Sequence, residues 1–361
     1  MKKSSPSRSA LIFGGAGFIG SNWAHYLLKN TDADVHVFDN LSRSRVQYNL
    51  RWLQKAGQDR LKVTIGDTRD FSLVRQAVSN ATDIYHFAAQ VAVTTSIDDP
   101  RNDFEINARG TFNILEAARL SGRNPFVLFT STNKVYGDLG LTNGGLESCR
   151  RHGISESQPL DFHSPYGCSK GTADQYVHDY ARIYNLPTVV FRMSCIAGPR
   201  QFGNEDQGWV AHFIYSVLQN KSISIYGDGR QVRDVLNVQD LVRAFAAVYE
   251  KRETTAGQIY NVGGGPGNAI SLLELLENIE KRLHKTVKFR FFPCRPGDQP
   301  VYVTNFSKLH EHVGWFPRIN VQQTVENIRE WWEENQELFV PTIFSMPSAK
   351  TPMESLREVA S

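Results

Sequence analysis

The sequence predicts an α/β fold in which a doubly wound parallel sheet is joined by a smaller mixed α/β region. Three observations predict it: a glycine-rich turn between an apolar run and a helical pattern, strand and helix patterns that alternate up to about residue 193, and a tyrosine four residues before a lysine at a helix start. Sheets of this kind bind ligands at the carboxyl ends of their strands, so the candidate site residues are expected there.

The first predicted unit is a strand, a turn and a helix. Residues 10–13 (A-L-I-F) are apolar, G-G-A-G-F-I-G follows, and S-N-W-A-H-Y-L-L-K has apolar positions that suit a helix. Gly14, Gly17 and Gly20, together with Phe18 and Ile19, therefore stand where a strand turns into a helix. Small residues there let the backbone approach a pyrophosphate, and the helix N-terminus offers N–H donors. In this setting the G-x-x-G-x-x-G spacing predicts a dinucleotide site of the Rossmann type.

The second predicted strand, V-H-V-F-D, ends at Asp39. A carboxylate at this point accepts hydrogen bonds from ribose hydroxyls and repels a 2′-phosphate, which favours NAD over NADP. Arg43 and Arg45 follow closely, and their positive charges would instead attract a 2′-phosphate, which favours NADP. The D-N-L-S stretch is also typical of a turn, so a turn-capping role for Asp39 is the alternative.

Further strand and helix patterns follow the first unit. K-V-T-I-G-D is expected to end a third strand at Asp67, near the adenine, and D-I-Y-H-F-A-A a fourth at Ala88 and Ala89, where small residues let a cofactor lie close. A helix is expected around residues 103–120, which include Asn107, and P-F-V-L-F-T-S-T and L-P-T-V-V-F-R are the fifth and sixth strands. The other candidates for cofactor contact are Asn40, Ser42, Arg43, Thr68, Gln90 and Arg192.

The pair most suggestive of catalysis is Tyr166 and Lys170, which form Y-x-x-x-K after Pro165. Residues four apart share a helix face, so the ammonium group is expected beside the phenol, where it would lower the pKa of the tyrosine. Such a tyrosine takes a proton from a sugar hydroxyl as hydride leaves the same carbon. Lys170 would also hold the nicotinamide ribose of the cofactor.

The composition argues against several classes of function. A net charge of +3 is too small to indicate nucleic acid or a membrane surface as a partner. The four cysteines show no C-x-x-C spacing, which is typical of reduced thiols in a cytoplasmic protein, and no metal site is expected. No apolar run approaches the roughly 20 residues of a membrane helix. Residues 1–8 and 341–361 are expected to be flexible tails.

Together these motifs resemble the extended short-chain dehydrogenase/reductase family, whose members act on nucleotide sugars. The resemblance extends over residues 10 to 330 and is carried by G-G-A-G-F-I-G, D-N-L-S, G-D at 66–67, Asn107 with G-T, S-T-x-x-V-Y-G, Y-x-x-x-K and R-P-G-D at 295–298. It implies that Thr132, Tyr166 and Lys170 form a catalytic triad and that NAD is bound tightly.

Several longer strings resemble one branch of that family, the CDP-paratose 2-epimerases, also called CDP-tyvelose epimerases. They are H-F-A-A-Q-V-A-V-T-T-S, S-T-N-K-V-Y-G-D, L-D-F-H-S-P-Y-G-C-S-K, D-Q-G-W-V and R-Q-V-R-D-V-L. This resemblance implies transient oxidation at C2 of a CDP-linked hexose, with Thr132 bonded to the reacting oxygen. The segment between residues 138 and 160 is compact for that branch. The resemblance therefore does not decide any substrate preference that depends on this loop.

The two residues after Thr132 distinguish possible reactions. Family members that eliminate water from C6 of the sugar have an Asp-Glu pair there, which supplies acid and base. This chain has Asn133 and Lys134, and neither side chain is a carboxyl group. The chain therefore lacks the acid and the base that a 4,6-dehydratase needs. This holds even if Lys134 itself only solvates the end of the strand or pairs with an acid.

On the substrate side, Arg233 and Arg295 are the candidates for binding pyrophosphate, because guanidinium groups bind phosphate through paired donors. Tyr226 is expected near the base. Cys195 occupies a position where many relatives have Asn, so a substrate contact is altered and its thiol is expected to pack. The other candidate substrate contacts are Thr94, Asn133, Lys134, Ser194, Gln207, Gly208, Trp209 and Asp298.

Residues 9–195 are expected to form the cofactor domain, with residues 232–262 returning to it, and residues 196–231 and 263–340 the substrate domain. Family analogy predicts a homodimer or homotetramer that uses the helices near 103–120 and 166–184. The alternatives are a UDP-hexose 4-epimerase with the same triad, a UDP-glucuronate decarboxylase, and an NAD-binding regulator without catalysis, for which loss of the triad would be expected. The sequence does not decide whether the nucleotide of the substrate is CDP, GDP or UDP.

Overall fold

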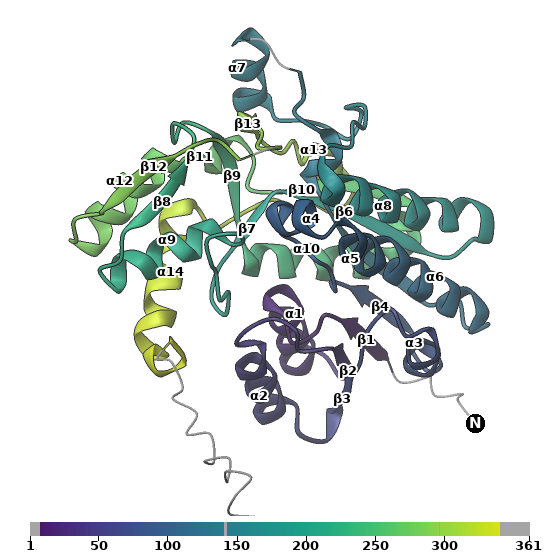
Figure 1. Cartoon of the computed structure of the whole chain (residues 1–361). Coiled ribbons are helices and arrows are strands. Elements are labelled where there is room, and N and C mark those ends of the chain that lie inside the picture. The colour runs from purple at the N-terminus through teal and green to yellow at the C-terminus, as the bar shows by residue number, and fades with distance from the viewer. Residues whose placement is uncertain (1–7, 141–142, 296, 340–361) are drawn as a thin grey trace, which may run out of the picture.

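A seven-stranded parallel sheet organises the larger part of the molecule (Figure 1). A computed structural model of the chain describes residues 8–140, 143–295 and 297–339. The strand order is β10-β6-β5-β4-β1-β2-β3, so the chain reverses direction across the sheet between β1 and β4, beside the glycine turn. The strands are β1 (Ser9–Phe13), β2 (Asp34–Asp39), β3 (Leu61–Ile65), β4 (Asp83–His86), β5 (Phe126–Thr132), β6 (Thr188–Met193) and β10 (Gln258–Val262).

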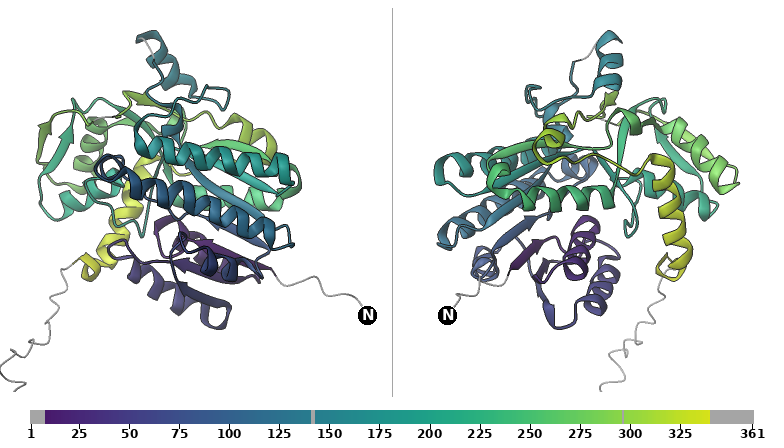
Figure 2. Two further views of the ribbon diagram at one scale, coloured as in Figure 1. Left: turned by 45° about the vertical axis from the view of Figure 1, so that its right-hand side comes forward. Right: turned by 180° about the vertical axis from the view of Figure 1, so that it is seen from behind.

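Helices cover both faces of this sheet, as Figure 2 shows from two further directions. Ala10 and Ile12 of β1 point into one core, and Leu11 and Phe13 point into the other, as the two-residue period of a strand requires. The first core is closed by α1 (Phe18–Asn30), α2 (Val46–Gly57) and α10 (Val238–Glu250), and the second by α3 (Phe71–Val78), α6 (Gly110–Leu120) and α8 (Ser164–Tyr184). The predicted doubly wound sheet is confirmed.

The observed ends of three elements differ from the sequence prediction. β3 ends at Ile65 and β4 at His86, so Asp67, Ala88 and Ala89 lie in loops just beyond the strands. The helix expected around 103–120 is three segments: α5 (Pro100–Phe104), a π-helical turn (Glu105–Arg109) and α6. π-Helical turns often occur at functional sites, and this one carries Asn107.

A smaller mixed unit lies beside the carboxyl end of the large sheet (Figure 1). Its four-stranded sheet contains β7 (Cys195–Ala197), β9 (Val232–Asn237), β11 (Ala269–Ser271) and β13 (Val301–Tyr302), and β8 (Ile223–Tyr226) pairs in parallel with β12 (Phe289–Phe292). Its own core is formed with α9 (Trp209–Leu218), α12 (Leu272–Leu283) and α14 (Val321–Glu334).

The predicted domain boundaries need one correction. Residues 232–237 form β9, which lies between β11 and β13, pairs also with β7 and is buried along its whole length. They therefore belong to the smaller sheet, and only α10 and β10 of the range 232–262 return to the large one.

The remaining helices are short. They are α4 (Val93–Asp98), α7 (Asn143–His152), α11 (Arg252–Thr255), α13 (Ser307–Val313) and 3-10 turns over Gln58–Arg60, Asn133–Tyr136, Pro266–Asn268 and Gln336–Phe339. The 138–160 segment contains α7, which projects from the rest of the molecule in Figure 1.

Arg8, the last residue of the first predicted tail, is held by the fold. Most of the two predicted tails, residues 1–7 and 341–361, lies outside the described residues. Arg8, expected in the first tail, pairs with Asp83 at 2.9 Å and lies 3.6 Å from the ring centre of Tyr249. Among the described residues, no helix is long and apolar enough to cross a membrane.

Candidate active site

The glycine turn leaves the start of α1 open for an anion. Gly14 has a φ of +76°, and a Cβ there would come within 2.6 Å of the backbone nitrogen of Ala88. A Cβ at Gly20 would collide with the backbone of Gly14 and Gly15. The N-cap residue Gly17 makes no side-chain capping bond, so N–H groups at the helix start are available to phosphate oxygens. The turn therefore fits the pyrophosphate of a dinucleotide.

Asp39 fixes the turn between β2 and the loop that follows. Its Oδ1 accepts a hydrogen bond from the backbone N–H of Leu41 at 2.8 Å, and its Oδ2 accepts one from that of Ala16 at 3.0 Å. Burial raises the pKa of Asp39, and these bonds oppose the rise. The alternative turn-capping role is thus present, and each oxygen still has a second lone pair, so the ribose contact stays a prediction.

A polar cluster lies beyond the ends of β2 and β3. Asn40 donates to Asp67 at 3.0 Å, and Arg69 donates to both oxygens of Asp67. The Arg69 hydrogen bonds lower the pKa of Asp67 to about 2, so this carboxylate stays charged at neutral pH. Ser42 donates its backbone N–H to Asn40, and Thr68 is buried against Gly110.

The loop after β4 is tied to the π-helical turn. Asn107 accepts from the backbone N–H of Gln90 at 2.9 Å and donates to the Gln90 carbonyl at 3.0 Å. Ala88 and Ala89 precede this clamp, and the Ala88 backbone faces Gly14. The structure thus brings three of the predicted cofactor elements to one edge of the sheet: the glycine turn, the Ala88 loop and Asn107.

The predicted triad comes from β5 and α8. Thr132 ends β5, and its hydroxyl acts on the phenol of Tyr166 to lower its pKa. Lys170, one turn after Tyr166, donates its ammonium to the carbonyl of Thr130 at 2.8 Å and lies 4.1 Å from the ring centre of Phe129. All three side chains of the triad are buried.

The electrostatics differ from the sequence expectation. Burial raises the pKa of Tyr166 to about 12, although the Thr132 hydroxyl and the nearby Arg43 act to lower it. Burial also lowers the pKa of Lys170 to about 7, against the opposing charges of Asp174 and Asp103. The expected depression of the tyrosine pKa by Lys170 is therefore absent, because desolvation outweighs attraction between charges at this depth.

Asn133 and Lys134 face the 297–299 segment. Asn133 donates to the buried Gln299 at 3.4 Å. The Lys134 ammonium donates to the carbonyl of Gly297 at 3.2 Å and lies 3.8 Å from Asp298. Burial lowers the pKa of Lys134 to about 8. The simpler interpretation of Lys134, that it pairs with an acid, agrees with this geometry.

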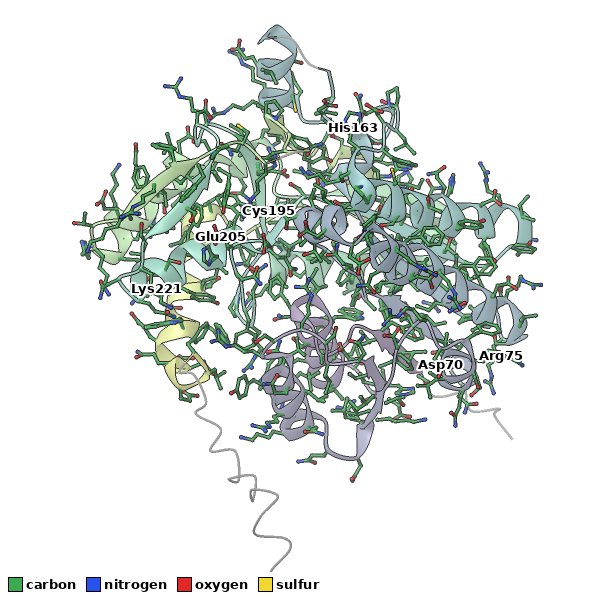
Figure 3. The ribbon with its side chains drawn as sticks, viewed as in Figure 1. Asp70, Arg75, His163, Cys195, Glu205 and Lys221 are labelled. Atoms are coloured by element: carbon green, nitrogen blue, oxygen red, sulfur yellow. The ribbon has the colours of Figure 1, made fainter. Side chains whose placement is uncertain are left out.

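Both arginines proposed for pyrophosphate are held by carboxylates. Arg233 donates to Asp298 at 2.6 Å, and Arg295 lies 3.4 Å from Asp206. Arg295 also stacks 3.8 Å from the ring centre of Tyr226. This cluster lies in the smaller unit, on the side where Figure 3 labels Glu205 and Cys195.

Several other candidates have their side chains engaged in the fold. Arg192 makes two bonds to Asp174, at 2.8 and 2.9 Å, and a third to Tyr136, so we leave it out of the proposed cofactor site. Ser194 donates to Asp234, and burial raises the pKa of Cys195 to about 12, which agrees with packing. Thr94 donates to Asp206 at 3.0 Å, and Gln207, Gly208 and Trp209 lead into α9.

Sequence reasoning missed two groups of acidic residues. Glu205 and Asp206 contact Tyr226, Thr94 and Arg295; Asp206 opens the string D-Q-G-W-V, but neither acid was assigned a contact from sequence. Asp103 is buried four residues before Asn107, a helical spacing that was available in the sequence. Asp138, Asp161 and His163 also approach one another, but all three are exposed, and exposed acidic groups are common without a metal.

Comparisons with known proteins agree with this geometry. A family model described as GDP-mannose 4,6 dehydratase matches residues 11–328. The chain is 41% identical over 334 residues to the CDP-paratose 2-epimerase of Salmonella typhi, and the match covers 89% of this chain and 98% of that protein. It is 31% identical over 352 residues to the dTDP-glucose 4,6-dehydratase of Neisseria meningitidis serogroup B, covering 91% and 94% of the two chains.

The fold is shared with solved structures. The UDP-glucose 4-epimerase of Thermus thermophilus in complex with NAD superimposes with a TM-score of 0.78 at 30% identity, covering 91% of this chain and 99% of that chain. The similarity thus extends over both units of the molecule.

Proposed function

We propose that this chain, which belongs to the family whose model is described as GDP-mannose 4,6 dehydratase, is an NAD-dependent epimerase. The proposed reaction inverts C2 of a CDP-linked hexose. The family lies within the extended short-chain dehydrogenases/reductases. The proposed substrates are of the CDP-paratose and CDP-tyvelose type, interconverted through a transient 2-keto sugar. The similarity to the Salmonella enzyme over nearly its whole length supports this choice.

One observation carries the proposal: neither of the two residues directly after Thr132 has a carboxyl group. Elimination of water from a 4-keto sugar needs an acid and a base near C5 and C6, and this chain has the amide of Asn133 and the ammonium of Lys134 there. Asn133 is bonded to Gln299, and Lys134 is held by Gly297 and Asp298. Oxidation and reduction at a single carbon do not require the acid and base of the dehydratases. The site therefore keeps what hydride transfer needs and lacks what elimination of water needs.

The reacting hydroxyl is proposed to lie between Thr132 and Tyr166. NAD, held by the glycine turn and the Ala88 loop, would supply a reversible acceptor for the hydride of C2. The deprotonated Tyr166 oxygen takes the proton of the C2 hydroxyl and gives it back when the ketone is reduced on its other face, so the bound complex has to offset the raised pKa of this phenol. The Thr132 hydroxyl orients the reacting oxygen, and the Lys170 ammonium, fixed on the carbonyl of Thr130, lies one helical turn after Tyr166 as a positive charge that favours the phenolate without outweighing its desolvation.

The nucleotide is proposed to bind in the smaller unit. Arg233 and Arg295 would take the pyrophosphate oxygens, and Tyr226 would lie against the base. Their present partners, Asp298 and Asp206, must share or release these arginines when a diphosphate binds. Guanidinium groups have five N–H donors, so sharing is possible without loss of the carboxylate contact.

We also propose that the chain forms a homodimer through α6 and α8. Phe112 of α6 and Tyr176 of α8 are 41% and 45% exposed and touch edge to face, with ring centres 5.8 Å apart. Other large apolar side chains on these two helices and on α5 are also exposed: Phe104, Leu120, Ile183 and Tyr184. An apolar patch of this extent is typical of a protein interface.

The test is NMR of the purified protein with CDP-tyvelose in D₂O, with observation of H2 and H4 of the sugar. Inversion at C2 with the original hydrogen retained is the expected result. Inversion at C4 with C2 untouched would instead identify a 4-epimerase, the alternative suggested by the Thermus structure. Inversion at C2 with deuterium incorporated would exclude direct return of hydride.

A further inference from the structure

Asp103 is a buried carboxylate that lies next to the triad and has no role in the mechanism above. It belongs to α5 and is 1% exposed. Its Oδ1 accepts hydrogen bonds from the amide groups of Gln90 and Asn107, at 2.9 and 3.1 Å. Its Oδ2 accepts one from the hydroxyl of Ser169, the residue directly before Lys170. One side chain thus joins the β4 loop, the π-helical turn and α8.

The charge of Asp103 is not neutralised by a nearby arginine. Within the described part of the chain, no ion pair involves Asp103, whereas Asp174, the other acid beside Lys170, is held by two bonds to Arg192. Asp103 acts on both catalytic side chains, raising the pKa of Lys170 and that of Tyr166. Burial raises the pKa of Asp103 itself, and the Lys170 charge acts against this rise.

We infer that Asp103 is a positioning residue of this site, which locks the Asn107 turn and the β4 loop to α8 through its hydrogen bonds and places next to Ser169 and Lys170 a negative charge that no arginine shares. The inference rests on the proposed function for its catalytic consequence, and on the contacts above for its location. Asp103 does not touch the triad directly and acts through Ser169 and through its charge.

The physical need for such a charge follows from the depth of Lys170. Burial favours the neutral amine, and an amine stabilises a phenolate less than an ammonium does. The titratable groups around Lys170 are Asp103 on α5, Asp174 and Tyr166 on α8, and His86 on β4. Burial holds the pKa of His86 well below its ordinary value, and Asp174, the larger of the two opposing charges, is shared with Arg192, so Asp103 is the acid beside Lys170 that opposes desolvation without an arginine partner among the described residues.

Asp103→Asn separates this charge from the packing. The amide has the same shape, and its oxygen can still accept from Gln90 and Asn107. Its NH₂ group would face Ser169, whose hydroxyl can rotate to donate to the carbonyl of Tyr166, 3.2 Å away, and accept in turn. Glu105→Gln is the matched control, because Glu105 lies two residues further along and pairs with Arg109.

The first readout needs no substrate. The pKa of Lys170 is measured by NMR of protein with ¹³C-labelled lysine, in which the Lys170 signal is identified by its absence from Lys170→Met. Asp103→Asn should lower this pKa by on the order of one pH unit, and Glu105→Gln should leave it unchanged. An unchanged pKa in Asp103→Asn, or an equal shift in Glu105→Gln, would overturn the inference. Asp103→Ser is a second neutral variant should the first not fold.

The second readout is the pH dependence of sugar turnover. In Asp103→Asn the loss of activity on the alkaline side should begin at lower pH, because Lys170 loses its proton sooner. Lower activity at every pH with an unmoved profile would mean that Asp103 only supports the fold, which would contradict the inference. If the wild-type protein fails to invert C2 while the Lys170 titration shifts as expected, the proposed function is wrong and the role of Asp103 stands.

Discussion

The buried pair of Arg192 and Asp174 gives the sharpest test of how the site is built. Its side chains are 4% and 0% exposed, and two hydrogen bonds of 2.8 and 2.9 Å join them. Arg192→Leu would leave the Asp174 carboxylate in the interior without its cation. Breaking a buried pair in this way costs about 3–5 kcal/mol, because the remaining charge is neither hydrated nor paired.

The assay is urea unfolding of the wild type, Arg192→Leu and the double variant Arg192→Leu/Asp174→Asn. The single variant should lose about 4 kcal/mol of unfolding free energy, and the double variant should regain most of it, because an amide is cheaper to bury than a charge. NAD affinity, measured by calorimetry on folded protein, should change little, because the guanidinium of Arg192 is directed at Asp174 and Tyr136.

The opposite pattern would refute this reasoning. If Arg192→Leu weakened NAD binding by about tenfold or more and left unfolding unchanged, the arginine would be a cofactor contact, as its position at the end of β6 predicts from sequence alone. A double variant no more stable than the single one would show that the lost free energy comes from packing of the arginine and not from the unpaired acid.

Three further predictions follow from the same contacts. Tyr166→Phe should lower kcat by about 10²–10⁴-fold while NAD stays bound, measured by sugar turnover and by the nucleotide released on denaturation; loss of both together would contradict a role in proton transfer. Because burial lowers the pKa of Lys170 to about 7 and the unfolded value is about 10.4, the unfolded chain binds more protons between these limits, so wild-type stability should rise with pH across this window. Lys170→Met should show a smaller rise in urea midpoint, and equal slopes would disprove the assignment. Phe112→Asp should convert a dimer to a monomer in size-exclusion chromatography with light scattering, and a monomeric wild type would contradict the proposed interface.

The sequence was sufficient where the determining interactions are local. The glycine turn, the strand patterns and the Tyr166–Lys170 spacing are set by residues that are neighbours along the chain, and the doubly wound sheet follows from their alternation. The position of Thr132 at the end of β5 was predictable for the same reason.

It was insufficient where the outcome depends on distant partners. Nothing local distinguishes Arg192 as the partner of Asp174, because the ion pair forms only when β6 packs on α8. The smaller sheet takes β9 because β7, β11 and β13 are there to pair with it, which no pattern within 232–237 reveals. The pKa of Tyr166 was predicted with the wrong sign because the sequence contains its charged neighbours but not the depth at which the fold buries it.

The distribution of charge across the site bears on how one enzyme could reduce both faces of a ketone. To invert a centre by returning hydride to the carbon it came from, the sugar must turn while the nucleotide stays bound. The charged groups that suit a firm hold on the diphosphate, Arg233 and Arg295, lie in the smaller unit with Tyr226. Next to Thr132 the chain has the neutral amide of Asn133 where a dehydratase would have a carboxylate able to fix the sugar. Because Lys134 is turned to Gly297 and Asp298, neither residue after Thr132 offers a carboxylate to fix the sugar, which suits the rotation that the proposed epimerisation requires and elimination does not.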